Sequence, residues 1–562
     1  MITTAKWQCR EVINIMVGYG VRDIVLCPGT RDTPLIMAAV RTPGLKVHDV
    51  VDERSAAFIA YGMCKLSRRP VAVVCTSGSA ALNLTPAIAE AYYAHCPVIA
   101  VTADRPDEWI DRDDSQTIRQ KGVMDNFVVK SVNVTCHCES ADVRNAITTN
   151  LNVALAEATS IKCGPVHINV EVDEPIAEEV EMDSAIALKS RVIHIYNDHV
   201  LGPDAINDTV CLMSEKRKIM IVGGFDFPMT RVQRERLARF AERDNVVLLS
   251  EHVSNMKTGN AITMIDEALV AIRNDKTMFY PDLVVSFGGA LVSRSLKEFI
   301  RESGAEHWMV GHHQMYPDCF STLTKVFPDK EEFLKMLDSV SVCVSDYNKL
   351  WHNVADGNIV VRKRFMADAP WCDLSVIDRI CREIPEGWNL QLSNGMTVRY
   401  ALGVPVLTAA TVHCNRGVSG IDGSLSTAVG ASVACEGNTL LITGDMSAQY
   451  DMGALASTLI DSRLRIVVMN NGGGGIFRFI RTTCRLPELD AHIASRSNFP
   501  ARALAEAFGF RFLQADDFDS LAEALELLFA PSDRPVMLLV NTSGKLSATI
   551  FHEYYKRFKN IY

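Results

Sequence analysis

The sequence predicts an α/β fold made of three doubly wound parallel-sheet domains. Short strands such as residues 71–76 and 440–443 are almost wholly apolar, as in a parallel sheet that helices cover on both faces. Helical segments alternate with these strands along the chain. Because 562 residues are too many for one hydrophobic core, about three domains are expected.

The first domain is assigned to residues 1–178, and a charged linker follows at 179–198. A helix is expected at 4–18, with Thr3 or Thr4 as its N-terminal cap. The later strands of this domain are predicted at 23–27, 46–51, 71–76, 97–102 and 166–170.

The central domain is assigned to 199–345, and the third domain to 372–562. The central domain has no complete Gly-x-Gly-x-x-Gly motif, so no dinucleotide is assigned to it. A second linker, of mixed helix and loop, is expected at 346–371, and the end of the chain is expected to form a surface helix or tail. The strands of both domains are predicted at 218–222, 246–250, 283–287, 308–310, 388–392, 406–409, 440–443, 465–469 and 536–541. The similar rhythm of the units suggests that one architecture is duplicated.

Composition narrows the class of protein. The net charge of −10 argues against nucleic acid as a main partner. No apolar run reaches the roughly 18 residues that span a bilayer. The sequence shows no signal peptide and its 16 cysteines are scattered, which predicts a cytoplasmic protein. Cys136 and Cys138 are too close together for a usual zinc site and are expected to be exposed at a strand end.

The stretch from 440 to 477 predicts a site for a metal ion and a diphosphate. Asp445 follows Gly444 at the end of one apolar strand, and Asn471 follows the next strand and precedes four glycines. Both side chains offer oxygen ligands of the kind that Mg²⁺ prefers. Glycines let a backbone approach a diphosphate closely. A turn, a helix cap or a flexible loop is the alternative for each piece alone.

Two further groups of residues suggest chemistry. Glu53 begins a helix directly after a strand, so it is either a helix cap or a carboxylic acid that meets a cofactor ring. Arg31, Arg105 and Arg416 follow strand ends, and Arg399 lies on a helix. Arginines at the ligand-facing ends of strands suggest an anionic substrate, and surface salt bridges are the alternative.

These motifs resemble the thiamine-diphosphate enzymes of the pyruvate oxidase and decarboxylase type. Longer segments narrow the resemblance to the members of this family that act in menaquinone biosynthesis. The resemblance covers both outer domains and is weak over 180–370. The segments that carry it are 27–35, 52–58, 75–81, 102–106, 415–423 and 470–477.

The resemblance implies a transferase that decarboxylates 2-oxoglutarate and adds the resulting succinyl carbanion to isochorismate. It implies thiamine diphosphate and Mg²⁺ or Mn²⁺ as cofactors, and a homodimer or homotetramer whose active sites are shared between subunits. Within the family, an acetolactate-synthase-like enzyme is the alternative, although the excess of arginines argues against it. A non-catalytic binding relative is the alternative from another class.

The resemblance also implies roles for individual residues. Glu53 would be catalytic, by protonating the pyrimidine ring of the cofactor. The metal ligands would be Asp445, Asn471 and Gly473. The cofactor would be bound by Glu53, Ser77, Gly78, Ser419, Ile421, Gly444, Asp445, Met446, Ser447, Asn471, Gly473 and Ile476. The substrates would be bound by Thr30, Arg31, Arg105, Gln116, Arg294, Gly395, Arg399, Arg416, Ile476 and Phe477. Asp32, Gly395 and Ser295 depart from the family pattern and put individual substrate contacts in doubt.

Overall fold

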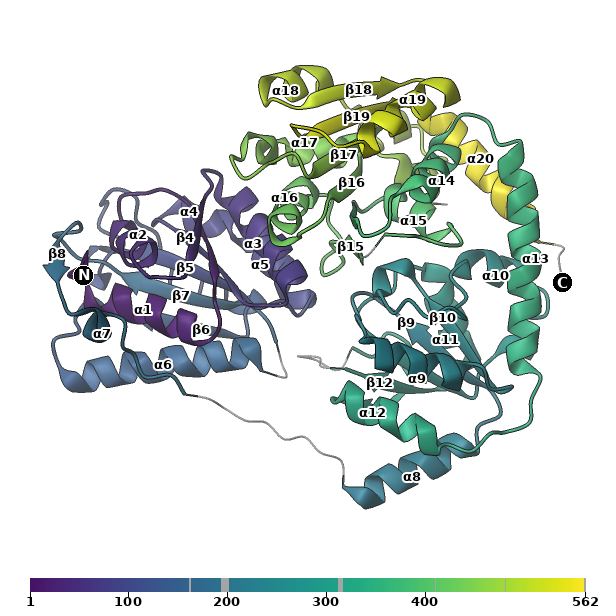
Figure 1. Ribbon diagram of the computed structural model, residues 1–562, viewed down its shortest axis with the longest axis horizontal. Coiled ribbons are helices and arrows are strands. Elements are labelled where there is room, and N and C mark those ends of the chain that lie inside the picture. Colours follow the sequence, from purple (N-terminus) through teal and green to yellow (C-terminus); the bar gives the residue numbers. More distant parts are fainter. Residues whose placement is uncertain (161–162, 194–201, 312–316, 410, 481, 560–562) are drawn as a thin grey trace. The chain divides into compact units, whose positions relative to one another are not determined.

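The computed structural model describes residues 1–160, 163–193, 202–311, 317–409, 411–480 and 482–559. These residues form two compact units. The first unit comprises residues 1–197, 417–439 and 450–464, and the second unit comprises 198–416, 440–449 and 465–562. The chain carries three open sheets flanked by helices, which confirms the predicted fold class (Figure 1). The sheets fall inside the three ranges predicted as domains, whose boundaries stay a prediction.

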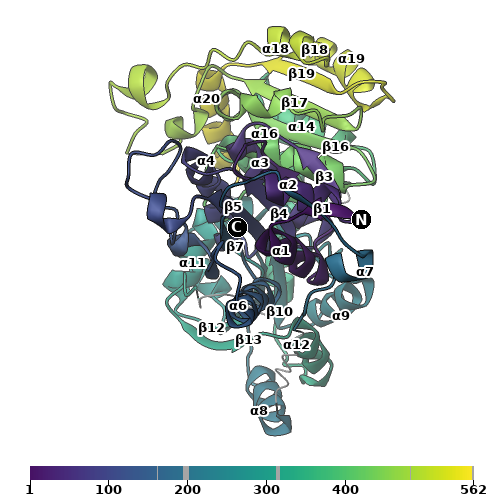
Figure 2. The same ribbon diagram turned by 90° about the vertical axis from the view of Figure 1, so that its left-hand side faces the viewer.

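The first sheet has six parallel strands in the order β3-β2-β4-β5-β7-β6. Helices α1 (Trp7–Gly18) and α6 (Ala141–Thr159) lie side by side and share one hydrophobic core with the sheet (Figures 1 and 2). Helix α3 (Glu53–Ser67) packs on β2, β4 and β5 outside that core. The strands are β2 (Asp23–Leu26), β3 (Lys46–Asp49), β4 (Val71–Cys75), β5 (Val98–Asp104), β6 (Lys130–Val134) and β7 (Val166–Glu171).

A helix from the C-terminal half of the chain, α16 (Ser424–Ala434), packs along α3 in the first unit. The two backbones touch at two glycines. A Cβ at Gly62 would lie 2.2 Å from the carbonyl oxygen of Thr427, and a Cβ at Gly430 would lie 2.0 Å from that of Ile59. Only glycine permits this approach, since real Cβ contacts are never so short.

The prediction for the N-terminus was wrong. Residues Ile2–Thr4 form strand β1, which pairs antiparallel with β8 (Glu179–Glu181), inside the segment predicted as a linker. The helix therefore begins at Trp7, and Lys6 precedes it without a side-chain cap. Backbone pairing with a strand 175 or more residues away is not visible in the local sequence. Residues 194–198 of the predicted linker lie outside the described residues.

The central sheet has five parallel strands in the order β10-β9-β11-β12-β13. One face is buried under α8 (Pro203–Ser214), α9 (Arg231–Ala241) and α12 (Lys330–Met336), and the other under α10 (Ile265–Ala271), α11 (Arg294–Ser303) and α13. The segment predicted as mixed helix and loop is mainly one helix, α13 (Tyr347–Ala367), because Tyr347, Trp351 and Val354 bury one of its faces (Figure 1). The strands are β9 (Ile219–Gly223), β10 (Val246–Ser250), β11 (Leu283–Phe287), β12 (Glu306–Val310) and β13 (Leu323–Phe327).

The third sheet has six strands in the order β15-β14-β16-β17-β19-β18. Counted along the chain, this is the strand order of the first sheet, which supports the predicted duplication. The strand predicted at 406–409 was wrong, because those residues are irregular and β15 begins at Thr411. The strands are β14 (Asn389–Leu392), β15 (Thr411–Cys414), β16 (Thr439–Gly444), β17 (Leu464–Asn470), β18 (Arg511–Ala515) and β19 (Val536–Asn541).

Two smaller expectations also need correction. The C-terminal helix α20 (Gly544–Lys556) is not a simple surface helix, because Tyr554 and the following Phe558 are buried and pack on each other. Cys136 and Cys138 are buried rather than exposed. Among the described residues, no helix is both long and apolar enough to cross a bilayer.

Candidate active site

The predicted metal residues meet at the carboxyl ends of β16 and β17, in the second unit. Asp445 begins helix α17 (Asp445–Tyr450), and its carboxylate is buried. Its Oδ1 accepts the Met446 N–H at 2.7 Å, and its Oδ2 accepts the N–H groups of Gly472 and Gly473 at 3.0 Å each. The Asp445 side chain thereby holds the start of the glycine loop against the end of the neighbouring strand.

Burial raises the pKa of Asp445 to about 6, and the three N–H donors oppose this shift. The carboxylate is therefore ionised at neutral pH, when it can bind a cation. Gly472 and Gly473 have φ angles of 87° and 137°, and a Cβ at Gly473 would lie 2.2 Å from the carbonyl oxygen of Ser495. This part of the loop requires glycine.

The side-chain amide of Asn471 has a buried oxygen that is suited to bind a cation. Its Nδ2 donates to Asp373 Oδ2 at 2.7 Å, which fixes the orientation of the amide. Its Oδ1 is buried and has no hydrogen-bond partner among the described residues. A buried acceptor without a partner is costly. An amide oxygen and a carboxylate at the ends of neighbouring strands fit a hard divalent cation such as Mg²⁺, so the residues present fit the predicted metal.

Asp373 is a functional candidate that the sequence did not reveal. It is buried, and burial raises its pKa. Thr542 donates to its second oxygen at 2.5 Å. The partners of Asp373 lie 98 and 169 residues away in the sequence, so no local motif marks it. In the described part of the chain, no three His, Cys, Asp or Glu side chains form a metal cluster.

The other predicted residues of this stretch lie on the same elements. Ser447 is buried in α17, whereas Met446 is half-buried. Ile476 and Phe477 lie in a short 3₁₀ helix (Gly475–Arg478) and are partly exposed, so their side chains are accessible to a ligand. The Gly473 carbonyl accepts the Gly475 N–H at 2.9 Å, which leaves its second lone pair for a cation.

Glu53 lies at the first position of α3 in the first unit. The cap of this helix is Asp52, whose Oδ1 accepts the N–H groups of Arg54 and Ser55 at 3.0 and 3.3 Å. Helix capping, the alternative for Glu53, is therefore performed by its neighbour. The Glu53 carboxylate is half-buried and accepts one long hydrogen bond, from Asn83 Nδ2 at 3.3 Å. Its Oε1 stays available for another donor.

The charge of Glu53 acts on a second carboxyl group of the first unit, that of Asp32. It is fully buried, and neither of its carboxylate oxygens has a hydrogen-bond partner among the described residues. Burial, and next the charge of Glu53, raise the pKa of Asp32 to about 7. The pKa of the Cys27 thiol is raised by burial and then by the charges of Glu53 and Asp32.

The structure brings Ser77, Gly78 and Gln116 together. Gln116 Nε2 donates to the Ser77 carbonyl oxygen at 3.2 Å, and a Cβ at Gly78 would lie 3.0 Å from Gln116 Cγ. A residue that the sequence did not mark, Gln120, accepts the Gly78 N–H at 2.7 Å and donates to Ala103 O at 3.0 Å. Gln120 thus ties the turn after β4 to the end of β5.

The arginines of the first unit have acidic partners. Arg31 is buried and contacts Glu174 at 3.2 Å, and its guanidinium also donates to Val172 O at 3.0 Å. Arg105 contacts Asp114 at 2.7 Å. These pairs are the salt bridges expected as the alternative to substrate binding. Thr30 accepts the Thr33 N–H, which shapes the turn before Arg31.

Arg399 and Arg416 of the second unit form a separate basic pair. Arg416 is buried, donates to Asn394 Oδ1 at 2.9 Å, and has an Nε without a partner in the described chain. Arg399 donates to the Gly395 carbonyl oxygen. Burial, and next the charge of Arg416, lower the pKa of Arg399. A ligand carboxylate would accept hydrogen bonds from these two guanidinium groups and reduce the repulsion between them.

Two carboxylates of the central domain balance this positive charge. Glu251 is buried, accepts the Ser293 N–H at 2.7 Å, and has its pKa raised to about 7 by burial. Asp266 accepts the Ser293 hydroxyl at 2.5 Å. Arg416 opposes the pKa shift of Glu251, and Arg399 that of Asp266. Arg399, Glu251 and Asp266 line one small cavity.

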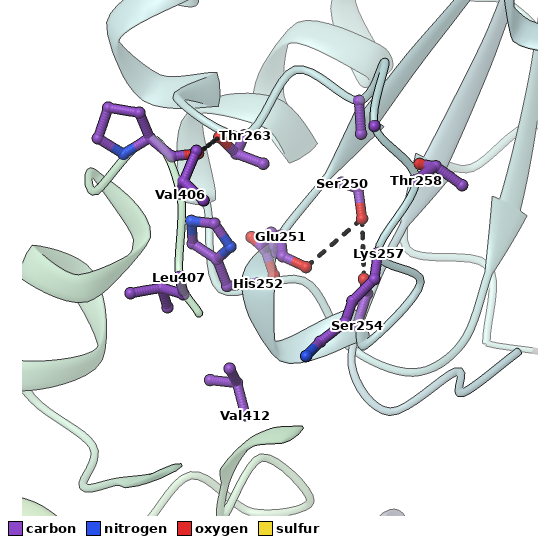
Figure 3. Close-up of a pocket in the computed structure, with 13 residues that line it drawn as sticks. Ser250, Glu251, His252, Ser254, Lys257, Thr258, Thr263, Val406, Leu407 and Val412 are labelled. Carbon is purple, nitrogen blue, oxygen red and sulfur yellow. Dashed lines mark hydrogen bonds between the residues drawn. The ribbon is translucent and has the colours of Figure 1, made fainter. Parts of the chain in front are cut away.

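A larger cavity of about 260 Å³ is also lined by Glu251 and lies at the end of β10 (Figure 3). The segment 405–407 forms its other wall, and the Thr263 hydroxyl fixes that segment by donating to Pro405 O at 3.0 Å. No residue predicted from the sequence as a site residue lines this cavity. Arg294, the predicted central-domain ligand, lies at the exposed start of α11 and pairs with Glu298 at 2.8 Å.

Two family models match the chain. Residues 10–123 match the model described as "Thiamine pyrophosphate enzyme, N-terminal TPP binding domain". Residues 394–540 match the model described as "Thiamine pyrophosphate enzyme, C-terminal TPP binding domain". The first match contains Glu53, and the second contains Asp445 and Asn471.

Curated relatives match nearly the whole chain. A protein of Porphyromonas gingivalis named 2-succinyl-5-enolpyruvyl-6-hydroxy-3-cyclohexene-1-carboxylate synthase is 37% identical over 550 residues, which are 95% of this chain and 94% of the relative. Proteins of the same name are 33% identical in Flavobacterium johnsoniae, over 97% of this chain and 98% of the relative, and in Bacteroides thetaiotaomicron, over 99% of each.

Proposed function

Because the chain belongs to the family of 2-succinyl-5-enolpyruvyl-6-hydroxy-3-cyclohexene-1-carboxylate synthases, we propose that it decarboxylates 2-oxoglutarate and adds the succinyl group to isochorismate. The chain is a thiamine-diphosphate-dependent transferase of menaquinone biosynthesis. The geometric observation that carries the proposal is the buried Asn471 Oδ1, which has no hydrogen-bond partner among the described residues and precedes the glycine loop that the Asp445 carboxylate holds.

Asp445, Asn471 and the Gly473 carbonyl would hold Mg²⁺ or Mn²⁺ on the diphosphate. The hydrogen bond from Asn471 Nδ2 to Asp373 fixes the amide, so that its oxygen would be the atom offered to the metal. When bound, thiamine diphosphate supplies a nucleophilic carbon that takes up the acyl group as CO₂ leaves. Ser77, Gly78, Ser419, Ile421 and Ile476 would complete the cofactor contacts.

Glu53 would hold a proton at its free carboxylate oxygen, opposite a ring nitrogen of the pyrimidine. Since Asp52 caps α3, the Glu53 carboxylate is not engaged by the helix N-terminus and remains available for that proton. Proton transfer by a positioned side chain typically contributes about 10²–10⁴-fold to rate.

Arg399 and Arg416 are proposed to bind the carboxylates of 2-oxoglutarate, and Arg31, Arg105 and Gln116 those of isochorismate. Within the residues that the structure describes, Arg416 Nε has no hydrogen-bond partner. This supports the assignment, because a buried guanidinium nitrogen without an acceptor favours an anionic ligand. Ile476 and Phe477 are proposed to pack on the apolar part of the substrates. Arg294 and Thr30 stay predicted substrate contacts.

The proposal is tested by substrate comparison. Purified protein with Mg²⁺ and thiamine diphosphate should release CO₂ from 2-oxoglutarate slowly, and faster when isochorismate is added. Pyruvate should be a poor substrate. A preference for pyruvate would support the acetolactate-type reaction instead.

The variant Glu53→Gln tests the catalytic residue. We expect kcat to fall by at least about 10²-fold, because the amide cannot give its proton to the pyrimidine. Circular dichroism and the affinity for thiamine diphosphate should stay close to those of the wild type. Turnover near the wild-type rate would show that Glu53 is not the catalytic residue.

We also propose that the enzyme is a cytoplasmic homodimer or homotetramer in which two subunits share each active site. Sedimentation velocity with and without the cofactors measures the assembly. A monomer with full activity would contradict the proposal.

A further inference from the structure

A buried glutamate of the first unit holds a loop that the proposed function places at the cofactor. Glu90 lies on α5 (Thr85–Tyr93) and is only 3% exposed. Its Oε1 accepts the Gly417 N–H at 2.7 Å, and its Oε2 accepts the Val418 N–H at 2.6 Å. The Tyr61 hydroxyl donates to Oε1 at 3.2 Å. A buried carboxylate needs such donors, and charge-assisted hydrogen bonds of this length are strong.

The contact is close as well as polar. A Cβ at Gly417 would lie 2.2 Å from the backbone carbonyl oxygen of Glu90 and 3.0 Å from its Cδ. Glycine at position 417 therefore lets the loop lie directly on α5. The two partners are 327 residues apart in the sequence.

The other end of the same loop, residues 417–423, is fixed by α3 and by Asp451. A Cβ at Gly423 would lie 2.3 Å from the ring of Phe58. Directly after it, the N–H and the hydroxyl of Ser426 donate to Asp451 at 2.7 and 2.9 Å. Asp451 also lies 3.8 Å from Arg54, the residue that follows Glu53.

Between these two attachments the loop turns outward. Ser419 has a φ of 69°, a conformation that costs energy for a residue other than glycine and is maintained by its surroundings. Ile421 is 38% exposed, although it is a large apolar residue. Both belong to the predicted cofactor contacts, and Arg416 directly precedes the loop.

We infer that Glu90 is a positioning residue of the synthase reaction, whose carboxylate fixes the position of loop 417–423 and with it the predicted contact between Ile421 and the cofactor. The inference rests on the proposed function. Glu90 is assigned no contact with cofactor or substrate of its own, and it acts through the two backbone N–H groups.

The variant Glu90→Gln keeps the shape of the side chain but replaces one acceptor oxygen by an NH₂ group, which cannot accept an N–H. In the protein without cofactor, we expect faster hydrogen–deuterium exchange in peptides covering 417–423, measured by mass spectrometry. In the loaded enzyme, kcat should fall about 10- to 100-fold, as for a misplaced reacting group. The KM for 2-oxoglutarate should change less than about threefold.

Glu11→Gln is the matched control. Glu11 is also a buried glutamate of the first unit, and its carboxylate accepts the hydroxyls of Thr148 at 2.5 Å and Ser190 at 2.6 Å. This variant removes the charge of a buried carboxylate but touches no part of loop 417–423. Exchange in the loop and kcat should remain at the wild-type values. Equal losses in both variants would show a general effect of stability and would overturn the inference.

Gly417→Ala disturbs the same contact from the side of the loop and leaves the Glu90 charge in place. We expect the same pattern, and the double variant should be no worse than the more affected single variant. If Glu90→Gln does not fold, Gly417→Ala decides alone. Wild-type behaviour of Gly417→Ala would then overturn the inference. Absence of synthase activity in the wild type would instead refute the proposed function.

Discussion

At the scale of single residues, Asp32 has a carboxyl group in a buried environment that disfavours its charge. Its carboxyl group is fully buried and unpartnered in the described chain, and its pKa is raised to about 7, mainly by burial. In an unfolded chain the pKa of an aspartate is near 3.8. The folded state therefore binds the proton more tightly, and its stability declines as pH rises from about 4 to about 7.

Asp32→Asn should remove this pH dependence, because an amide of the same shape carries no charge. We expect the melting temperature at pH 8 to rise by about 2–4 °C. At pH 5 the gain should be clearly smaller, since most of the loss of stability in the wild type lies between pH 5 and pH 7. Differential scanning fluorimetry at both pH values measures the effect.

The exposed Asp49, at the end of β3, provides a control for that measurement. Asp49→Asn should shift the melting temperature equally little at both pH values. A gain for Asp32→Asn that is as large at pH 5 as at pH 8 would contradict the assigned protonation of Asp32.

At the scale of elements, helices α3 and α16 pack closely against each other. Helix α3 begins with Glu53, and α16 directly follows loop 417–423. Their contact depends on Gly62 and Gly430, each of which faces a backbone carbonyl of the other helix. Neither glycine is in a conformation that excludes other residues, so the requirement comes from packing alone.

Gly430→Ala should separate these helices. We expect a cost of about 1–3 kcal/mol, as for overpacking in a well-filled core, and a lower melting temperature. Cofactor affinity should fall with it, because loop 417–423 precedes α16. Ser432→Ala, at another buried position of α16, removes only a hydroxyl without a partner among the described residues and should have little effect. Equal stability of the two variants would show that the contact tolerates a methyl group.

At the scale of the whole molecule, the first and third sheets repeat one strand order and place polar residues at equivalent strand ends. Ser77 follows β4 and Asp445 follows β16, which are the third strands of their sheets in chain order. Arg105 and Asn471 follow the next strands, β5 and β17. Ligands of open parallel sheets bind beyond the carboxyl ends of the strands, so each half of the proposed site uses the same architectural position.

Binding of metal and cofactor should stabilise the whole protein, because they bind only the folded state. At concentrations about 100 times Kd the gain is about 2.7 kcal/mol. Thiamine diphosphate with Mg²⁺ should therefore raise the melting temperature, and EDTA should reverse most of the rise. In Asn471→Ala the rise should be small with or without EDTA. A full rise in the presence of EDTA would contradict the metal site.

The sequence alone was sufficient for the fold class and most strands of the three sheets. It also placed Asp445 and Asn471 at neighbouring strand ends, and their role as metal ligands stays a prediction. Apolar strands and the Gly-Asp and Asn-Asn-Gly sequences that follow them are local patterns. Because the strands of a parallel sheet run in the same direction, their carboxyl ends lie at one edge of the sheet. Glu53 was also a candidate from the sequence, since it begins a helix after a predicted strand, and its catalytic role stays a prediction. These predictions depend on neighbours within a few residues.

Contacts between distant segments could be decided only by the tertiary structure. The β1–β8 pair, the hydrogen bond from Asn471 to Asp373 and the attachment of loop 417–423 to Glu90 each join residues about 100 to 330 positions apart. The burial of Asp32 is of the same kind, because neighbours from other elements remove its water. Hydrogen bonding and desolvation depend on which residues are neighbours in space. A sequence pattern shows these neighbours only within one helix or strand.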